Sequence, residues 1–341
     1  MTDWTNKSYK QIGVKEPVRC EDRSFGDESD DEEVEELSDR GENEKDSASS
    51  QDNSDALKIL HEVIFTTISQ WITNDELIIV PDGSSFLIPY AALVDQQSRY
   101  LSERLRIRLA PSLTTLSLLT QCPEEHHSKS GALLVGNPWV QTVRLEGDKF
   151  QQLPGAAKEV KTIGKMLNIE PLTGTNATKD QVLSKLHSVS LVHIAAHGCA
   201  KTGEIILSPN NVNSEKPPKE DFLLTMADVL NAKLKAKLVL LSCCHSGTGK
   251  IRAEGVVGIA RAFLGAGARA VVASLWAISD EATMAFMTHF YECLMAGQSA
   301  SKSLNQTMKW MREFDDFRAV RHWAPFVLIG DDVTMDFEKS R

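Results

Sequence analysis

The sequence of 341 residues has no uninterrupted apolar run of the roughly 18 residues that a membrane-spanning helix needs. Its first 20 residues carry scattered charges and no apolar stretch of the kind found in a secretory signal. It also lacks a basic excess: the formal net charge is −10, which gives no electrostatic case for binding nucleic acid. These absences argue against membrane, secreted and nucleic-acid-binding proteins, and we expect a cytoplasmic protein.

Regular cysteine spacing is missing as well. The six cysteines stand at positions 20, 122, 199, 243, 244 and 293, and the adjacent pair is poorly placed to bridge itself. Without a secretory signal, the pattern predicts reduced thiols, which are either buried packing residues or reactive nucleophiles.

The negative charge is concentrated at one end of the sequence. Residues 1–54 contain 17 acidic and 7 basic side chains, whereas residues 55–341 contain 30 of each. The run DESDDEEVEE at 27–36 has a single apolar residue, too few to offset the entropy of ordering the chain. We expect 1–54 to be a disordered acidic tail, either merely solvated or used for docking or inhibition, and 55–338 to form one globular domain.

Helical and strand patterns alternate through this second part. Apolar residues at three- and four-residue steps predict helices over 56–73, 112–119, 156–167, 179–187, 226–233, 255–265, 281–294 and 301–314. Apolar runs predict strands over 107–109, 131–138, 190–198, 203–209, 236–244, 268–278 and 325–329, and apolar pieces flank a turn at Asp82-Gly83. The polar stretch 210–221 is expected to be a surface loop. Continuous apolar strands separated by helices predict an α/β fold with a mostly parallel sheet covered on both faces.

Reactive side chains follow two of these strands. His197 and Gly198 end the run VHIAAHG, and Cys244 ends a run that continues into a loop with Gly247. Chemistry in open α/β sheets sits beyond the carboxyl ends of the strands, so a Cys–His pair could form there. The histidine would take the thiol proton and return it to a leaving amine, but a buried, unreactive Cys244 also fits the pattern.

Zinc is the main chemical competitor, with six potential ligands in this region: His193, His197, Cys199, Cys243, Cys244 and His245. His193 and His197 would lie about 13 Å apart on one strand, too far to share a tetrahedral metal. We therefore expect no metal site. Cys243 and His193 are expected to be core residues, and His245 is too near Cys244 in sequence to be a well-placed base.

Several motifs together resemble the CHAT family of caspase-like domains, which is grouped with caspases, separases and gingipains and is often attached to tetratricopeptide repeats. The motifs are HIAAHG at 193–198, LVLLSCCHSGTGK at 238–250 and EGVVGIARAFLGAGARAVVASLWAISDEAT at 254–283. Upstream segments match too: LIIVPDGSSFLIPYAALVD, APSLTTLSLL, ALLVGNP and LPGAAKEVKTI. The resemblance extends over residues 56–331.

The resemblance implies a caspase-like α/β/α sandwich with a Cys–His dyad at His197 and Cys244. Backbone N–H groups of Gly198 and Cys244 would form the oxyanion hole, and no metal or cofactor would be needed. Similarity to separases implies that Asp280 lines the pocket for the residue before the cut and favours Arg or Lys there. Asp280 is also well placed to cap the helix that starts near Glu281.

Two functions follow from this interpretation. The first is a cysteine endopeptidase that cleaves a protein substrate, in a signalling or cell-death and defence pathway. The second is a catalytically silent scaffold that recruits signalling partners. No tetratricopeptide repeats are present in the sequence, so such a module is missing, is supplied in trans as a partner or regulator, or has been cut away. His245 departs from the family pattern, in which an acidic residue often follows the nucleophile.

Overall fold

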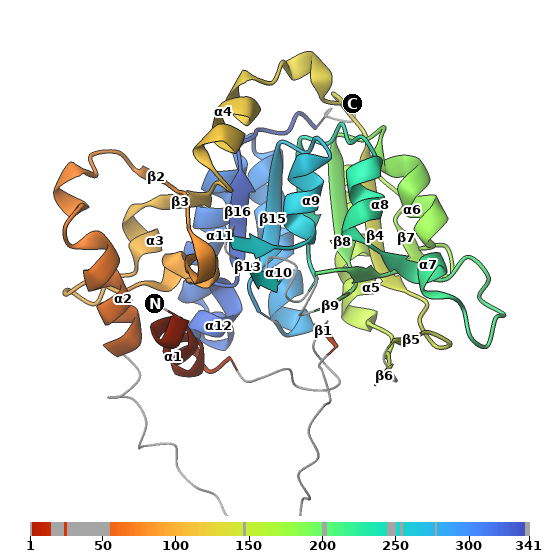
Figure 1. Ribbon diagram of the computed structural model, residues 1–341, viewed down its shortest axis with the longest axis horizontal. Coiled ribbons are helices and arrows are strands. Elements are labelled where there is room, and N and C mark those ends of the chain that lie inside the picture. The colour runs from red at the N-terminus through yellow and green to blue at the C-terminus, as the bar shows by residue number, and fades with distance from the viewer. Residues whose placement is uncertain are drawn as a thin grey trace, which may run out of the picture.

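The computed structural model describes residues 2–14, 24–25, 55–145, 148–199, 203–243, 250–252, 255–276 and 278–337 (Figure 1). The acidic run at 27–36 and the residues Cys244, His245 and Gly247 lie outside this part of the chain. Within it, no helix has the length and apolar character needed to cross a membrane.

An eight-stranded sheet forms the centre of the molecule. Its strands, in spatial order, are β2 (Glu76–Ile79), β3 (Arg106–Leu109), β16 (Phe326–Gly330), β15 (Ala270–Ser274), β12 (Leu238–Leu241), β8 (Leu191–Ala195), β4 (Ala132–Pro138) and β7 (Leu172–Gly174). All neighbours are parallel except β15 and β16. The four central apolar runs expected from the sequence lie side by side as β15, β12, β8 and β4, and every residue of β8, β12 and β15 is buried.

Helices cover both faces of this sheet (Figure 1). One layer contains α5 (Pro154–Leu167), α10 (Asp280–Met295) and α11 (Ala300–Glu313), and the other contains α6 (Lys179–Leu186), α8 (Met226–Asn231) and α9 (Ile259–Gly265). The apolar side chains between these layers form one continuous core. The expected α/β/α sandwich around a mostly parallel sheet is confirmed.

Shorter elements complete the described chain. The remaining helices are α1 (Thr2–Ile12), α2 (Asp55–Phe65), α3 (Leu101–Arg104), α4 (Leu113–Gln121), α7 (Lys219–Phe222) and α12 (Val320–Trp323). The 3₁₀ turns are η1 (Ser69–Trp71), η2 (Gly83–Leu87), η3 (Tyr90–Ala92), η4 (Glu124–His126) and η5 (Asp315–Phe317). Two small hairpins pair β5 (Arg144–Leu145) with β6 (Asp148–Lys149) and β13 (Lys250–Arg252) with β14 (Gly255–Val257).

A second small sheet lies at the carboxyl end of β8. It contains β1 (Ser24–Phe25), β9 (His197–Cys199), β10 (Ile205–Ile206) and β11 (Leu223–Leu224), in that order. The single strand expected over 190–198 is therefore wrong: β8 ends at Ala195, and the chain enters this sheet at His197. The residues before this break, in β8, pair with β4 and β12, whereas the residues after it, in β9, pair with β1 and β10.

Two other expectations need correction, and the apolar piece after Asp82-Gly83 takes a defined structure. The helix expected over 56–73 ends at Phe65, where two β-branched threonines follow, and Trp71 is 68% exposed. The apolar piece at 84–95 forms the turns η2 and η3, since Pro89 lacks the N–H that a central strand position requires. The helix expected from residue 255 starts at Ile259, because Gly255–Val257 pair with β13.

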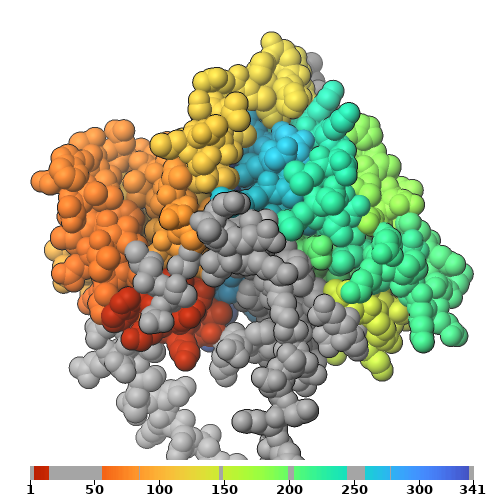
Figure 2. Space-filling model, viewed as in Figure 1, coloured from red at the N-terminus to blue at the C-terminus, as the bar shows by residue number. Residues whose placement is uncertain are grey.

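The N-terminal segment also differs from the expected disordered tail. Residues 2–12 form helix α1, in which Ile12 is buried and Trp4 and Tyr9 pack against the core. The Tyr9 hydroxyl donates to the Leu87 carbonyl oxygen at 2.6 Å, and the Leu57 N–H donates to Gln11 Oε1 at 3.1 Å. Figure 2 shows this red segment seated beside the orange residues of the domain, where α1 packs against α2. The expectation of disorder is thus wrong for residues 2–14.

The connection at 210–221 is a surface loop for most of its length, as expected. Its exposed residues include Asn210, Asn211 and Glu215, and the chain becomes helical again in α7.

Close contact between α5 and β4 depends on Gly136. A Cβ atom at this position would lie 2.7 Å from the Ala156 carbonyl oxygen and would overlap the Val160 side chain. The helix therefore lies against the sheet at a distance that no larger residue allows.

We expect Gly136→Ala to lower the free energy of unfolding by about 1–3 kcal/mol, because the added methyl group must displace the backbone of α5. The matched control is Gly265→Ala in α9. Its new Cβ would meet only the Leu230 side chain, which is 51% exposed and free to move. Helix propensity then favours alanine by up to about 1 kcal/mol. Urea unfolding followed by circular dichroism measures the free energy of unfolding of each variant. Equal changes in this free energy for the two substitutions would contradict the close contact at Gly136.

Candidate active site

His197 stands at the first position of β9 and is 6% exposed. Its Nε2 atom lies 2.8 Å from the backbone carbonyl oxygen of Gln151, and its ring packs on the Phe150 ring with centroids 5.4 Å apart. Both partners belong to the segment that leads into α5. The imidazole is therefore held on one side by an apolar ring and at one end by a fixed acceptor.

The bond to Gln151 determines which ring nitrogen of His197 carries the proton. A carbonyl oxygen only accepts, so Nε2 must be the N–H that donates to it. In the neutral ring the other nitrogen, Nδ1, is then the one with a lone pair. This is the tautomer that a general base needs when it receives a proton through Nδ1.

The candidate nucleophile Cys244 lies outside the described residues, but the chain is described up to Cys243. The Ser242 N–H donates to the Ile194 carbonyl oxygen at 2.9 Å, and the Cys243 Sγ lies 3.3 Å from the same oxygen. Cys243 is 1% exposed, which confirms it as a core residue. The chain thus reaches residue 243 beside the end of β8, three residues before His197.

Asp280 is the first residue of α10, and its carboxylate lies directly against Gly155 at the start of α5. A Cβ atom on Gly155 would overlap this carboxylate. The expectation that Asp280 caps the helix is wrong: the N-cap is Ser279, whose hydroxyl accepts from the Ala282 N–H at 3.4 Å. Asp280 instead places its carboxylate near the amino-terminal ends of two helices, α10 and α5.

One short segment therefore contacts two of the expected site residues. Gln151 holds His197, and Gly155, four residues later, contacts Asp280. Four residues span at most about 14 Å, so the two side chains lie near each other at the same end of the sheet. In Figure 1 this is the lower end, where β9 lies beneath the parallel strands.

Gly198, expected to supply an oxyanion-hole N–H, is the central residue of β9. It pairs with Ser24 of β1 on one side and with Ile205 of β10 on the other. A segment from the N-terminus of the chain therefore runs parallel to the strand that carries His197.

His193 is a core histidine, as expected. It is fully buried, and its two ring nitrogens contact Glu159 and Tyr291. Among the described residues, no three His, Cys, Asp or Glu side chains gather in a way that could hold a metal ion.

A Cys–His contact that was not expected from the sequence lies on α10. Cys293 Sγ is 3.8 Å from His289 Nε2, and His289 Nδ1 is 3.1 Å from Glu292 Oε2. Burial and the neighbouring Glu292 charge raise the pKa of the Cys293 thiol. A thiol with a raised pKa is a poor nucleophile at neutral pH, so this pair serves as an internal comparison for the candidate dyad.

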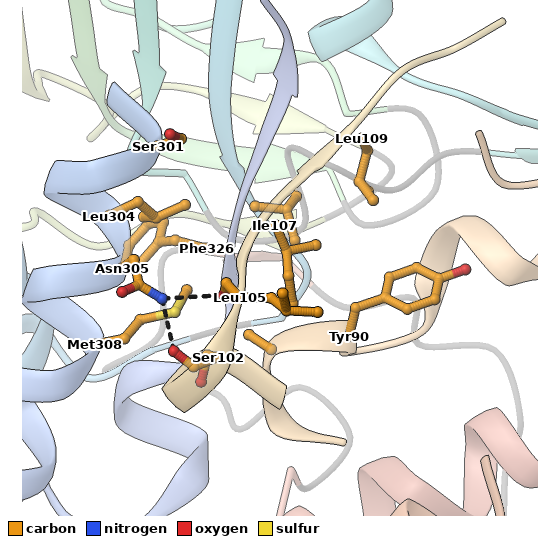
Figure 3. A pocket seen from close by; sticks show the side chains of 12 residues that line it. Tyr90, Ser102, Leu105, Ile107, Leu109, Ser301, Leu304, Asn305, Met308 and Phe326 are labelled. Atoms are coloured by element: carbon orange, nitrogen blue, oxygen red, sulfur yellow. Dashed lines mark hydrogen bonds between the residues drawn. The ribbon is translucent and has the colours of Figure 1, made fainter. Parts of the chain in front are cut away.

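The pocket drawn in Figure 3 lies between β3, β16 and α11 and is lined mainly by apolar side chains, among them Leu105, Ile107 and Phe326. Asn305 crosses it and donates to the carbonyl oxygens of Ser102 and Leu105, at 2.6 and 3.2 Å. None of the candidate site residues lines this pocket.

The contacts of Gln151 and Phe150 were not expected from the sequence. Gln151 acts through a backbone oxygen, which every residue possesses, so its side-chain type carries no signal. The only indirect signal is position, since both residues stand just before the motif LPGAAKEVKTI.

Curated relatives share part of their length with this chain. Tetratricopeptide repeat protein 28 of Homo sapiens is 32% identical over 303 residues, which cover 78% of this chain and 12% of the relative. The Mus musculus protein of the same name is 30% identical with the same coverage. The chain thus spans about an eighth of the length of these relatives.

Solved structures share the fold at low identity. The separase–securin complex of Saccharomyces cerevisiae matches with a TM-score of 0.54 and 16% identity, over 76% of this chain and 16% of that chain. The Arg-specific cysteine proteinase gingipain R, known as RgpB in Porphyromonas gingivalis, matches with a TM-score of 0.50 and 11% identity, over 84% and 69%. The CHAT domain family matches residues 54–331, most of the sequence. The chain belongs to the CHAT domain family and has a caspase-like fold.

Proposed function

We propose that this domain is a cysteine endopeptidase in which Cys244 is the nucleophile and His197 the general base and acid. The observation that carries the proposal is the bond from His197 Nε2 to the Gln151 carbonyl, because it leaves Nδ1 as the basic nitrogen. The position of Cys243 beside Ile194 supports it, since the next residue in the chain is the candidate nucleophile.

The reaction follows from these roles. His197 Nδ1 takes the proton of the Cys244 thiol, and the thiolate attacks the carbonyl carbon of the scissile peptide bond. The C–N bond breaks as the imidazolium gives its proton to the leaving amine, which leaves a thioester. Water, deprotonated by the same nitrogen, then hydrolyses the thioester to a carboxylic acid and regenerates the thiol.

Backbone N–H groups of Gly198 and Cys244 are the proposed donors to the oxyanion that forms during both steps. Gly198 fits this role because it follows His197 directly and has no side chain to obstruct the reacting carbonyl.

We propose that Asp280 recognises the substrate side chain that precedes the cleaved peptide bond. Its carboxylate lies near the segment that holds His197, and an ionised carboxylate pairs best with the guanidinium of arginine or with lysine. The similarity in fold to RgpB, which is named as Arg-specific, agrees with this assignment. The substrate is a protein, and we place its cleavage in the cytoplasm, in a signalling or cell-death and defence pathway. The free thiols of Cys122 and Cys293 fit a reducing compartment.

Active-site labelling tests the dyad. We expect an arginine-directed acyloxymethyl ketone to modify Cys244, with the adduct located by peptide mass spectrometry. His197→Ala should slow this labelling by roughly 100-fold or more, the usual contribution of a general base. Cys244→Ala should abolish it, whereas Cys293→Ala should leave it unchanged because that thiol has a raised pKa. Labelling spread over several cysteines, or independent of His197, would contradict the dyad.

Substitution of Asp280 tests the specificity pocket. Asp280→Asn should lower the rate of labelling by the arginine probe about 30-fold or more, as expected for the loss of about 2 kcal/mol from a desolvated charge pair. Labelling by a probe with an uncharged residue should change little. The control is Glu281→Gln, which removes a charge from the same first turn of α10 at an exposed position. If both variants weaken arginine labelling equally, the effect comes from the helix terminus and not from a pocket.

A second candidate function is a scaffold without catalysis. It is favoured by one observation, that the curated relatives are named for tetratricopeptide repeats and extend far beyond the region shared with this chain. In this case the domain would bind a tetratricopeptide-repeat partner or regulator in trans. The cellular effect of the protein should then survive Cys244→Ala, whereas a peptidase loses its effect with that substitution.

A further inference from the structure

Three buried polar side chains meet in the layer between the central sheet and its helices. His193 Nε2 lies 2.8 Å from Glu159 Oε1, and His193 Nδ1 lies 3.1 Å from the Tyr291 hydroxyl. All three residues are at most 1% exposed, and they come from β8, α5 and α10. We refer to His193, Glu159 and Tyr291 as the buried triad.

Chemistry assigns a direction to the bonds of this triad. Burial and the nearby Glu159 charge hold the pKa of Tyr291 well above its usual value, so its hydroxyl stays protonated and can donate to His193 Nδ1. His193 Nε2–H then donates to the Glu159 carboxylate, which accepts. The order of donation runs from Tyr291 through His193 to Glu159. Each member depends on the next, because a buried donor or acceptor without its partner is costly.

Each of the three elements leads to a different part of the candidate active site. β8 carries His193, and the chain reaches His197 of β9 four residues later. α5 carries Glu159 one helical turn after Gly155, which contacts Asp280, and Gln151 precedes this helix. α10 carries Tyr291 about three turns after Asp280, its first residue. Helix α5 packs against both β8 and α10.

We propose that the buried triad is a set of positioning residues, which fixes β8, α5 and α10 relative to one another and thereby aligns His197 with the Asp280 pocket. Apolar side chains would fill this space without a polar cost, but they would allow the helices to slide or rotate. Hydrogen bonds have narrow preferred lengths and angles and therefore specify one arrangement. The proposal rests on the proposed peptidase function for its consequence, although the alignment itself is a property of the fold.

Glycines at the contacts of α5 make such an anchor necessary. Gly136 and Gly155 allow α5 to approach β4 and Asp280 closely, but they provide no interlocking side chain that resists sliding. The bond from Glu159 to His193 supplies that resistance near the middle of the helix. A displacement of about 1 Å at a reacting group can cost on the order of 100-fold in rate, so small shifts of α5 matter.

The decisive variant is Tyr291→Phe, which removes one hydroxyl and keeps the ring. Its matched control is Tyr90→Phe: the Tyr90 hydroxyl is also buried, donates to the Ser85 carbonyl oxygen at 2.9 Å, and makes no bond to β8, α5 or α10. Both variants should lower the urea midpoint by similar amounts. We expect only Tyr291→Phe to slow the maximal rate of Cys244 labelling by the arginine probe, about 10-fold or more, with Tyr90→Phe within about twofold of wild type.

A conservative pair of variants separates geometry from charge. Glu159→Gln retains an oxygen that accepts from His193 Nε2–H, whereas Glu159→Leu does not. The glutamine variant should label near the wild-type rate, and the leucine variant should resemble Tyr291→Phe or lose more. If Tyr291→Phe is labelled at the wild-type rate while its stability falls as much as that of Tyr90→Phe, the proposal is overturned and the buried triad is a purely structural feature.

A readout without catalysis distinguishes failure of this proposal from failure of the peptidase function. Histidine ring carbons are labelled with ¹³C in the Cys244→Ala protein, and the His197 signal is assigned by its loss in His197→Ala. Tyr291→Phe should shift the His197 signal, and Tyr90→Phe should not. If Cys244 of the wild-type protein is not labelled, the proposed peptidase function is wrong. The His197 signal then tests the positioning role on its own, and a signal that Tyr291→Phe does not shift overturns that role.

Discussion

The position of helix α5 is the constraint on which the rest of the site depends. Gly136 lets the helix lie against β4, and Gly155 lets the Asp280 carboxylate approach its first turn. The residues just before the helix hold His197, and Glu159 in its second turn bonds to β8 through His193. One element, with the residues just before it, therefore contacts the proposed base His197, the proposed pocket residue Asp280 and the buried His193. Such an arrangement is sensitive to small errors, because interiors packed at crystal-like density transmit displacement and do not absorb it.

The contact between Cys293 and His289 indicates that proximity to a histidine does not by itself activate a thiol. Cys293 has a histidine 3.8 Å away, but that histidine also contacts Glu292, and burial raises the pKa of the thiol. A carboxylate beside the pair opposes formation of a second negative charge on sulfur. At His197 the Nε2 partner is an uncharged backbone carbonyl. The Gln151 oxygen thus orients the ring without adding a full negative charge beside it.

Much of the fold could be predicted from hydrophobic pattern, and the failures have identifiable physical causes. The continuous runs that became β4, β8, β12 and β15 are buried on both faces, so their signal is strong. The hydrophobic pattern gives no sign of the break at Ala196, because buried residues lie on both sides of it and together resemble a single strand. The residues of the dyad could be named from motifs, whereas the Gln151 carbonyl and the buried triad arise from contacts between distant segments. Periodicity reports burial along one element and cannot report which element lies opposite.

The expectation that residues 1–54 form a disordered tail failed for residues 2–14 because it rested on the charge averaged over the whole segment. The distribution of charge within the segment also bears on the role of the acidic run. Residues 1–25 contain four acidic and five basic side chains, whereas residues 26–54 contain thirteen and two. The first part is nearly neutral and includes Tyr9 and Ile12, which is enough for α1 to pack on the domain. The acidic run begins two residues after Phe25, the end of a strand that pairs with β9. The pocket proposed around Asp280 would select a cation, whereas the acidic run carries the same negative charge as Asp280. The acidic run is therefore not the occupant that the chemistry of this pocket would favour.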